Sequence, residues 1–312
     1  MEKNRGSSDL YDVIIIGAGP AGYTAGIYTS RAGRKTLLLS GILPGGQLMN
    51  TTLVENFPGF EEGIMGPELM EIIRAQTKKM GTEIIDERVI RVDFKKKPFK
   101  VSTKTKEYLG KAVIICTGAD YKKLEVKGEL ELAGRGVSYC AVCDGPFFKN
   151  EEIVVVGGGD SAMEEALFLT QFGKKIHVIH RREDLKASNV MQERAFANKK
   201  IQFHWNSEVK EIRGTEKVDE IIIHNNKTKK DSTLKTGAVF IAIGHIPNSR
   251  IFEGQVQLDA RGYIVVKNRT ETSTKGVFVA GDVHDHLYRQ AVTAAGFGCM
   301  AALDVDRYLS EE

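Results

Sequence analysis

Residues 12–40 read DVIIIGAGPAGYTAGIYTSRAGRKTLLLS, and residues 152–180 repeat the same pattern as EIVVVGGGDSAMEEALFLTQFGKKIHVIH. The two stretches align without a gap at a constant offset of 140 residues. Each begins with a β-branched run, as a strand buried on both faces does. A glycine-rich turn, a stretch of helix length and a second apolar run follow in both. The repeat therefore predicts two strand–helix–strand units, each with a G-x-G-x-x-G/A first turn.

The spacing of the glycines in this turn has a physical reason. Gly17 lets the chain turn tightly out of the strand, and Gly22 lets the helix pack closely on it. Gly19 has no Cβ, so a pyrophosphate can approach the backbone at the positive N-terminus of the helix. A single copy is also compatible with a tight turn that binds nothing, whereas two copies favour two dinucleotide sites. The second copy has the same positions filled by Gly157, Gly159 and Ala162.

The two units differ at the end of their second strand, where a diphosphoribose site usually carries an acid for the ribose 2′-OH. The first copy ends in Ser40–Gly41, and a serine hydroxyl is a weaker partner for that hydroxyl. The second ends in His180–Arg182, whose two guanidiniums suit a 2′-phosphate, and Lys186 adds a further cation. The second unit is therefore predicted to bind NADPH rather than NADH. The alternative is a solvated basic turn.

Further apolar runs that end in glycine predict how the domains are arranged. Residues 111–118 resemble residues 237–244, and residues 276–282 form another buried run that ends in Gly-Asp. We expect an α/β fold of two Rossmann-like dinucleotide-binding domains, with the second inserted in the first. The first would comprise residues 1–119 and 249–312, and the second residues 120–248. The two chain crossings between them would form a hinge.

The second domain carries the sequence Cys140-Ala-Val-Cys143-Asp144. In a cytosolic α/β protein, Cys-x-x-Cys favours a redox dithiol. If a helix begins here, its geometry places both sulfurs on one face, within bonding reach, and its N-terminus stabilises a thiolate. Asp144 is a candidate to protonate a departing thiolate if burial raises the pKa of its carboxyl. The alternative for Asp144 is a solvated or capping residue.

A zinc site is the other interpretation of the cysteine pair. Tetrahedral zinc needs four ligands, and the sequence has no second paired cluster. Cys116 and Cys299 are isolated and are interpreted as small buried apolar residues. Asp282 follows the last buried run, so it is a candidate to bind a polyol hydroxyl of a cofactor, or to cap a helix.

Composition excludes several classes of protein. The 312 residues have 44 Lys+Arg against 41 Asp+Glu, so the net charge of +3 gives no electrostatic case for a nucleic-acid partner. No apolar run approaches the roughly 18 residues of a membrane span, and the first ten residues contain no apolar core of a signal peptide. Four cysteines are too few for a secreted disulfide scaffold and indicate a cytoplasmic protein.

Two dinucleotide sites and one dithiol define a route for electrons. Hydride enters from NADPH, a flavin accepts it, and the flavin reduces the Cys140–Cys143 disulfide. The dithiol then passes the electron pair to an external disulfide. The redox chemistry belongs to the cofactor, and the protein positions it.

With these motifs in place, the chain from Tyr11 to about Leu309 closely resembles the low-molecular-weight thioredoxin reductases of bacteria and archaea. Besides the two glycine turns and the cysteine pair, the motifs that carry the resemblance are GGQL (45–48), VENFPG (54–59), CTGA (116–119), AIGHIPN (242–248) and GDVHDHLYRQA (281–291). The resemblance implies a homodimer that binds FAD and NADPH and reduces thioredoxin. It also implies that Cys143 lies nearest the flavin, that Cys140 attacks thioredoxin, and that Asp144 is the acid–base residue. In this family the inserted domain rotates, so that nicotinamide and dithiol take turns at the flavin.

The resemblance also implies cofactor contacts. The FAD contacts would be Gly17, Gly19, Pro20, Ala21, Ser40, Gly41, Gly46, Gln47, Asn56, Thr117, Gly118, Asp282, Arg289, Gln290 and Ala291. The NADPH contacts would be Gly157, Gly159, Asp160, Ser161, Ala162, His180, Arg181, Arg182, Lys186, Ile243 and Gly244.

The chain departs from the family pattern at Lys186, where the family has a third arginine. Lysine keeps the charge but lacks the planar fork of arginine. Three functions stay open: an NADPH-dependent thioredoxin reductase, a sibling flavin reductase with another protein acceptor or with ferredoxin as donor, and a non-enzymatic nucleotide-binding redox sensor. Assays with several disulfide proteins would separate the first two, and the absence of turnover would identify the third.

Overall fold

The computed structural model describes residues 10–42 and 44–312. The chain divides into two compact units, each described here by itself. Unit 1 contains Ile246–Glu312 and the described residues up to Asp120, and unit 2 is Tyr121–His245. The fold is mixed α/β, as the repeat predicts. In the described part of the chain, no helix combines the length and apolar character needed to cross a membrane.

Unit 1 is built on a largely parallel sheet with strand order β5-β2-β1-β8-β7-β6, in which β19 also pairs with β8. Strands β5, β2, β1, β8 and β19 are parallel to one another, whereas the hairpin β6–β7 adds antiparallel strands at one edge. The strands are β1 Leu10–Ile16, β2 Thr36–Leu39, β5 Glu83–Ile85, β6 Arg91–Asp93, β7 Phe99–Ser102, β8 Glu107–Ile115 and β19 Val277–Val279. Residues 13–16 are buried on both faces, which explains their uninterrupted apolar run.

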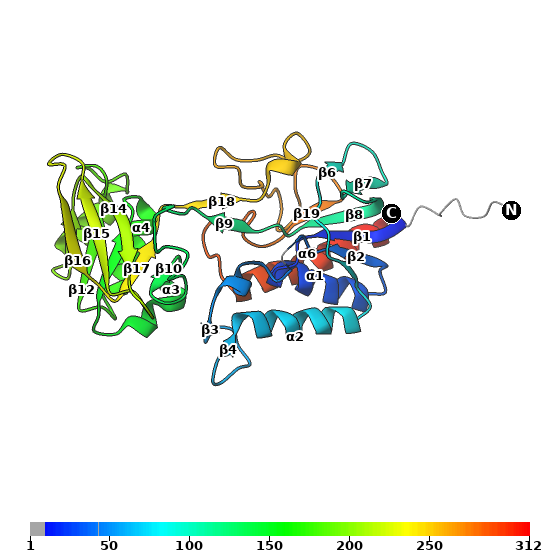
Figure 1. Cartoon of the computed structure of the whole chain (residues 1–312). Helices are drawn as coiled ribbons and strands as arrows, with labels where there is room; N and C mark the ends of the chain where they lie inside the picture. The colour runs from blue at the N-terminus through cyan, green and yellow to red at the C-terminus, as the bar shows by residue number, and fades with distance from the viewer. Residues whose placement is uncertain (1–9, 43) are drawn as a thin grey trace. The chain divides into compact units, whose positions relative to one another are not determined.

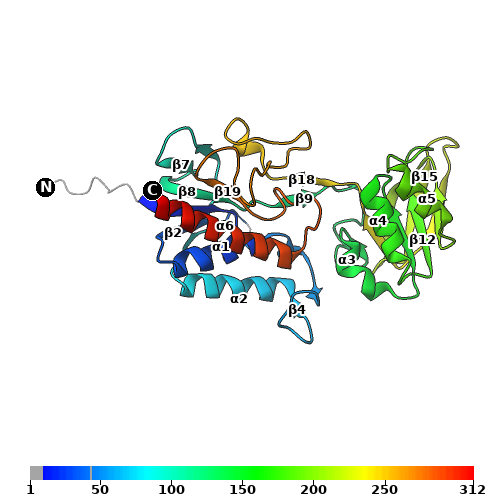
Figure 2. The ribbon, with the colours of Figure 1, turned by 180° about the vertical axis from the view of Figure 1, so that it is seen from behind.

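Three long helices cover one face of this sheet (Figures 1 and 2). They are α1 Pro20–Arg31, α2 Gly66–Lys79 and α6 Ala291–Glu311. Pro20 is pre-organised for the first turn of α1, and Gly81, with φ +104°, follows the end of α2. The remaining short elements of unit 1 are η1 Gly46–Asn50, β3 Leu53–Val54, β4 Ile64–Met65 and η3 Arg250–Phe252.

Unit 2 contains a parallel sheet with strand order β10-β17-β11-β12-β13 and an antiparallel sheet β14-β15-β16. The first is made of β10 Val137–Ser138, β11 Glu152–Val156, β12 Lys175–Ile179, β13 Ile201–His204 and β17 Ala238–Ile241. The second is made of β14 Ser207–Arg213, β15 Glu220–Asn225 and β16 Asp231–Lys235. The helical elements are α3 Ala141–Asp144, η2 Gly145–Phe148, α4 Asp160–Leu169 and α5 Asn189–Ala197.

The chain crosses between the units twice. The crossing strands, β9 Ala119–Tyr121 and β18 His245–Pro247, pair as a short two-stranded sheet. Each unit has apolar cores built only from its own residues. That each unit serves as a separate nucleotide-binding domain remains our proposal.

Candidate functional site

The first glycine turn, in unit 1, leaves bare backbone at the start of α1. Gly17 has φ +109°, and a Cβ there would lie 2.3 Å from the carbonyl oxygen of Cys116. A Cβ at Gly22 would lie 1.9 Å from the carbonyl oxygen of Gly17, so that position accepts only glycine. By contrast, the Cβ position of Gly19, the N-cap residue of α1, has no atom of the other described residues within 4 Å apart from its two neighbours in the chain. Two glycines therefore close the turn, and the third leaves room beside a helix N-terminus for a phosphate.

Asp282 lies three residues after Val279, the last residue of β19. Its Oδ1 atom is buried and has no hydrogen-bond partner among the residues that the structure describes. Burial raises the pKa of its carboxyl to about 7, helped by the nearby Asp285 and opposed by Arg289. An orphaned buried carboxyl fits a cofactor that supplies hydroxyl groups, such as the polyol chain of a flavin nucleotide. The capping alternative is wrong, because α6 begins nine residues later with Gln290 as its N-cap.

The turn before α6 is held by Asp285, which the sequence reasoning did not single out. Its carboxylate accepts hydrogen bonds from the backbone N–H groups of Leu287, Tyr288 and Arg289 at 3.0, 3.0 and 3.2 Å. Arg289 takes the left-handed conformation, with φ +49°. Gln290 forms a capping box with Thr293, and Ala291 opens α6. The sequence carries no clear signal for this turn, because the left-handed position is filled by an arginine rather than by glycine or asparagine.

The Ser40–Gly41 edge carries a charged pair that the sequence reasoning missed. The Ser40 hydroxyl donates to Asp86 Oδ1 at 2.6 Å, and Arg74 donates to Asp86 Oδ2 at 2.7 Å. The Arg74 guanidinium holds the pKa of Asp86 below its usual range, against the effect of partial burial. Asp86 directly follows β5, so unit 1 does have an acid at a strand end near the expected ribose position. The sequence does contain an acid after a strand, but that strand is β5, which pairs with β2, and not β2 itself.

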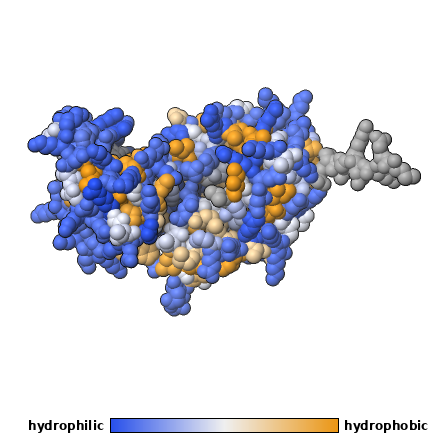
Figure 3. Space-filling view, viewed as in Figure 1, coloured by the Kyte–Doolittle hydropathy of each residue, from blue (hydrophilic) through white to orange (hydrophobic). Residues whose placement is uncertain are grey.

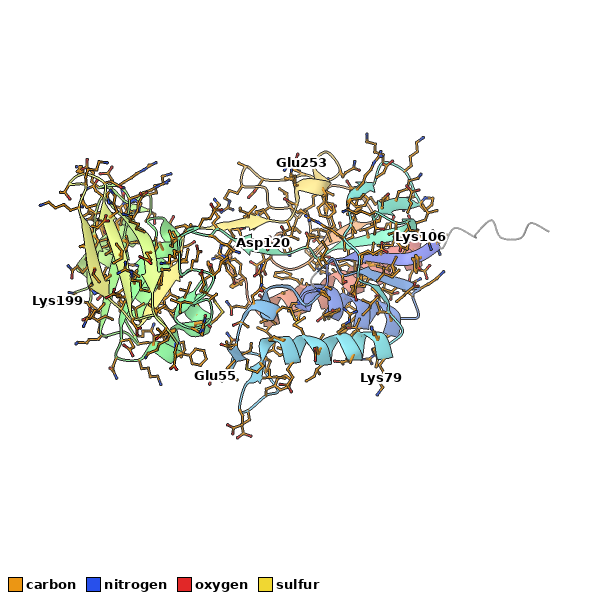
Figure 4. All side chains as sticks on the ribbon, viewed as in Figure 1. Glu55, Lys79, Lys106, Asp120, Lys199 and Glu253 are labelled. Atoms are coloured by element: carbon orange, nitrogen blue, oxygen red, sulfur yellow. A yellow bond between two sulfur atoms is a disulfide. The ribbon has the colours of Figure 1, made fainter. Side chains whose placement is uncertain are left out.

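Gln47 and Asn56 lie in two separate hydrogen-bonded groups of unit 1. The Gln47 side chain donates to the carbonyl of Ala119 at 3.2 Å and to Asp120 Oδ1 at 2.8 Å (Asp120 is labelled in Figure 4). The Asn56 amide donates to Gln290 Oε1 at 3.4 Å.

The Thr117–Gly118 segment is fixed by Asn248. The Thr117 hydroxyl donates to the Asn248 carbonyl at 2.7 Å, and the Asn248 amide donates back to the Thr117 carbonyl at 3.2 Å. The backbone N–H of Asn248 donates to the Gly118 carbonyl at 3.0 Å. Gly46 and Gly118 both have positive φ, at +66° and +67°, which glycine adopts without strain.

The second glycine turn, in unit 2, has the same design. A Cβ at Gly157 would lie 2.4 Å from the carbonyl oxygen of Ala242. The Cβ position of Gly159 has no described residue within 4 Å apart from its two neighbours in the chain. Gly159 is the N-cap of α4, and Asp160, Ser161 and Ala162 form its first turn. Asp160 Oδ1 accepts the backbone N–H of Ser188 at 2.8 Å, and this bond lowers the pKa of Asp160. The Asp160 carboxylate is thus occupied in binding the loop that carries the basic residues.

The basic loop folds back onto the glycine turn. The backbone N–H groups of Lys186 and Ala187 donate to the Gly158 carbonyl at 2.7 and 3.1 Å. The His180 ring packs where a Cβ of Gly158 would be, 2.3 Å from that position, which makes this middle glycine necessary. Burial is the main cause that lowers the pKa of His180, and the charges of the two arginines lower it further.

The side chains of Arg181, Arg182 and Lys186 are exposed to solvent. The structure therefore brings the three cations and the turn into one part of unit 2. Ile243 and Gly244 follow β17, and the Gly244 carbonyl accepts the backbone N–H of Lys122 at 3.0 Å.

The two cysteines of the C-x-x-C motif form a disulfide, with their Cα atoms 5.3 Å apart. Cys140 is the N-cap of α3, and its Sγ accepts the backbone N–H of Cys143 at 3.2 Å. The expected helix is present but only one turn long, so little helix dipole acts on the sulfurs. Local N–H groups, rather than a long helix, are what this segment offers to a thiolate.

Asp144 lies beside the disulfide and is half-buried. The Ser138 hydroxyl donates to Asp144 Oδ2 at 2.6 Å and accepts the backbone N–H of Cys140 at 3.1 Å. Burial raises the pKa of Asp144, and the bond from Ser138 opposes part of that rise. A carboxyl with a raised pKa next to a disulfide is suited to donating a proton to a leaving sulfur.

The remaining cysteines lie in unit 1. Cys116 is buried directly after β8, as expected, and burial raises the pKa of its thiol. Cys299 in α6 is only half-buried, so the expectation that it is a buried apolar residue is wrong. The α6 face that carries Cys299 is incompletely covered within this chain.

Comparisons with known proteins agree with this geometry. The family model of the pyridine nucleotide-disulphide oxidoreductases matches residues 11–298. A thioredoxin reductase from Streptomyces clavuligerus is 52% identical over 309 residues, covering 97% of this chain and 95% of that protein. One from Rickettsia felis is 53% identical over 304 residues, covering 96% of this chain and 98% of that protein.

Solved structures give the same result. The structure of thioredoxin reductase from Streptococcus pyogenes has a TM-score of 0.93 and 43% identity, covering 98% of this chain and 100% of that one. That from Giardia duodenalis has a TM-score of 0.92 and 44% identity, covering 96% of this chain and 99% of that one. Both compact units are included in these matches.

Proposed function

Because the chain belongs to the pyridine nucleotide-disulphide oxidoreductase family, we propose that it is a thioredoxin reductase that uses NADPH and FAD. The observation that carries the proposal is the Cys140–Cys143 disulfide beside a half-buried carboxyl, in the unit that also holds a glycine turn and a basic edge. A pyridine nucleotide, a flavin, a dithiol and a disulfide acceptor are the four parts that such a reaction needs.

We assign FAD to unit 1 and NADPH to unit 2. The bare backbone at Gly19 and the orphaned carboxyl of Asp282 support the first assignment. The open position at Gly159 and the cations that the loop brings to it support the second. Bound FAD would supply the redox centre that takes electrons from the nicotinamide and gives them to the disulfide. The proposed contacts remain those given in the sequence analysis, with Asp86 and Arg74 added at the Ser40 edge.

The thiol chemistry follows from the residues beside the disulfide. Two electrons and two protons convert Cys140–Cys143 into two thiols. We propose that Cys140 then attacks thioredoxin, because the N–H of Cys143 points at its Sγ and favours negative charge there. A bond forms between Cys140 Sγ and one thioredoxin sulfur, the thioredoxin disulfide breaks, and Asp144 protonates the departing sulfur. Attack by Cys143 on Cys140 Sγ restores the original disulfide and releases reduced thioredoxin.

We also propose that the enzyme is a cytoplasmic homodimer. The side chains of Val292, Met300 and Leu303 on α6 are 43%, 39% and 46% exposed, although they are apolar. Figure 3 shows further apolar patches on the surface of unit 1. A second copy of the chain covering such a surface would remove this area from water. The cytoplasm is the compartment in which thiols are kept reduced.

The test is coenzyme oxidation by the purified flavin-loaded enzyme with oxidised thioredoxin, using NADPH and NADH in parallel. We expect thioredoxin-dependent oxidation with a strong preference for NADPH. Cys143→Ser should still bind the flavin but lose turnover, whereas Cys299→Ser should keep it. Retained thioredoxin reduction in Cys143→Ser would overturn the role of the dithiol. If the rate of coenzyme oxidation does not depend on thioredoxin but rises with another disulfide protein, only the assignment of the acceptor is overturned.

A further inference from the structure

An acidic residue follows directly after the basic pair of unit 2. Glu183 is the next residue after Arg182, yet a carboxylate at this edge would repel a 2′-phosphate. It would also compete for the arginines, because a guanidinium binds a carboxylate in the same bidentate manner as a phosphate. The side chain of Glu183 does neither here, because it forms an ion pair with Lys227.

Lys227 belongs to the turn between β15 and β16, far from Glu183 in the sequence. The Asn225 side chain holds this turn by accepting the backbone N–H groups of Lys227 and Thr228 at 3.0 and 2.9 Å. The backbone N–H of Lys229 also donates to the Asn225 carbonyl at 2.8 Å. The backbone from which the Lys227 side chain extends is therefore fixed.

Backbone hydrogen bonds attach this turn to the basic edge. The N–H of Asn226 donates to the carbonyl of Asn206 at 2.6 Å, and the N–H of Asn206 donates to the carbonyl of Arg182 at 3.0 Å. The N–H of Ser207 donates to the carbonyl of His180 at 2.9 Å. The turn is thus held next to the segment that carries both arginines, and the Lys227 ammonium is within reach of Glu183.

From this geometry we infer that Lys227 is a specificity-determining residue for the coenzyme, which acts by holding Glu183 away from the arginine pair. The inference rests on the proposed function, because it needs a 2′-phosphate at that edge. When Lys227 is removed, the nearest cations along the chain are Arg181 and Arg182. Glu183 then pairs with them and opposes the phosphate. Both side chains of the ion pair are largely exposed, 61% for Lys227 and 62% for Glu183, so the effect is modest and sensitive to salt.

The experiment is a double-mutant cycle on the flavin-loaded enzyme with thioredoxin as acceptor. KM and kcat are measured for NADPH and for NADH in wild type, Lys227→Gln, Glu183→Gln and the double variant. At low ionic strength we expect Lys227→Gln to raise the KM for NADPH roughly two- to fivefold, with kcat and the KM for NADH unchanged. In the Glu183→Gln background, the same lysine substitution should have little effect, because no carboxylate remains to be released. The rise should shrink as salt is added.

Lys210→Gln is the matched control. Lys210 forms an ion pair of the same type with Asp231 at 2.8 Å, within the same β14-β15-β16 sheet but outside the turn bonded to Asn206. Its loss should leave both KM values unchanged. An equal KM rise from Lys227→Gln in the wild-type and Glu183→Gln backgrounds would overturn the inference, as would an equal rise for both coenzymes or no rise at all. A wild type without preference for NADPH would overturn the coenzyme assignment itself, and with it this inference.

Discussion

Asp144 has surroundings unlike those of an ordinary surface aspartate. Its carboxyl is half-buried, accepts a hydrogen bond from Ser138, and lies in the same turn as the disulfide. Burial penalises the charged form, so this carboxyl keeps its proton to a higher pH than an aspartate in water does. A proton held next to the sulfurs is available when a thiolate leaves.

Asp144→Asn should therefore lower thioredoxin reduction about 100-fold, because the amide cannot donate a titratable proton to the leaving sulfur. Reduction of a small artificial acceptor such as ferricyanide should be unaffected, since that reaction breaks no disulfide. Rates with both acceptors, measured across pH, check this.

In wild type the rate of thioredoxin reduction should fall as pH rises through the raised pKa of Asp144. The variant should not show this fall. Asp219→Asn, at an exposed position in the same unit, is the control. Equal loss with both acceptors would point to damage elsewhere.

At this scale, the sequence predicts best those residues whose partners are close along the chain. Cys140 and Cys143 are three residues apart, and this spacing, together with the absence of a second ligand cluster in the sequence, favoured their pairing. The partner of Ser40 was not, because Asp86 lies 46 residues further on and meets it only through the pairing of β2 with β5. Asp282 was ambiguous because the start of the following helix depends on the Asp285 turn.

At the scale of elements, the two glycine turns are similar but not interchangeable. In the first, a methyl group at Gly22 would run into the backbone of Gly17. In the second, the methyl group of Ala162 is already accommodated and fully buried. The repeat in the sequence predicted both strand–turn–helix units, and the structure has them as β1–α1 and β11–α4. The first turn leaves less room for a methyl group than the second. This difference depends on the exact positions of backbone atoms, which the sequence pattern does not predict.

Substitutions at Gly22 and at Ala162, the equivalent position of the second turn, should differ in their effect on stability. Gly22→Ala should destabilise unit 1 by about 3 kcal/mol and lower its flavin content, because the clash is with backbone that cannot rotate away. Ala162→Gly should cost less, about 1–2 kcal/mol, from the difference in helix propensity and the loss of one buried methyl group. Thermal unfolding and flavin absorbance per chain measure both effects. Similar losses in the two variants would mean that the first turn relaxes more readily than its geometry indicates.

At the scale of the whole molecule, the order of the chain does not match the order of the units. Unit 1 is completed only when Ile246–Glu312 supplies β19 and α6, after unit 2 has been made. Helix α6 packs against α1, and β19 pairs with β8. The sequence indicated this insertion, because a further apolar run that ends in glycine, residues 276–282, appears after the second unit.

Residues 121–245 expressed alone should therefore fold and bind NADP⁺, since the apolar clusters of unit 2 contain no described residue of unit 1. Circular dichroism and a cooperative thermal transition test the folding, and calorimetric titration tests the binding. Residues 10–120 alone should fail to fold, because they lack β19 and α6. A fragment of 121–245 without a cooperative transition would show that its stability depends on unit 1.

The stacked pair Phe203 and Trp205 of unit 2 allows the protein to be followed by its own fluorescence. Trp205 is the single tryptophan of the chain, stacked on Phe203 with ring centroids 4.9 Å apart and edge-on to His180 at 6.3 Å. All tryptophan emission therefore comes from one place, beside the basic loop. A flavin absorbs light where tryptophan emits, so with FAD bound to unit 1 as we propose, energy transfer from Trp205 would report the distance between the basic loop and the flavin. The rotation of the inserted unit that the family resemblance implies would be seen as a change in this energy transfer during turnover, without any attached dye.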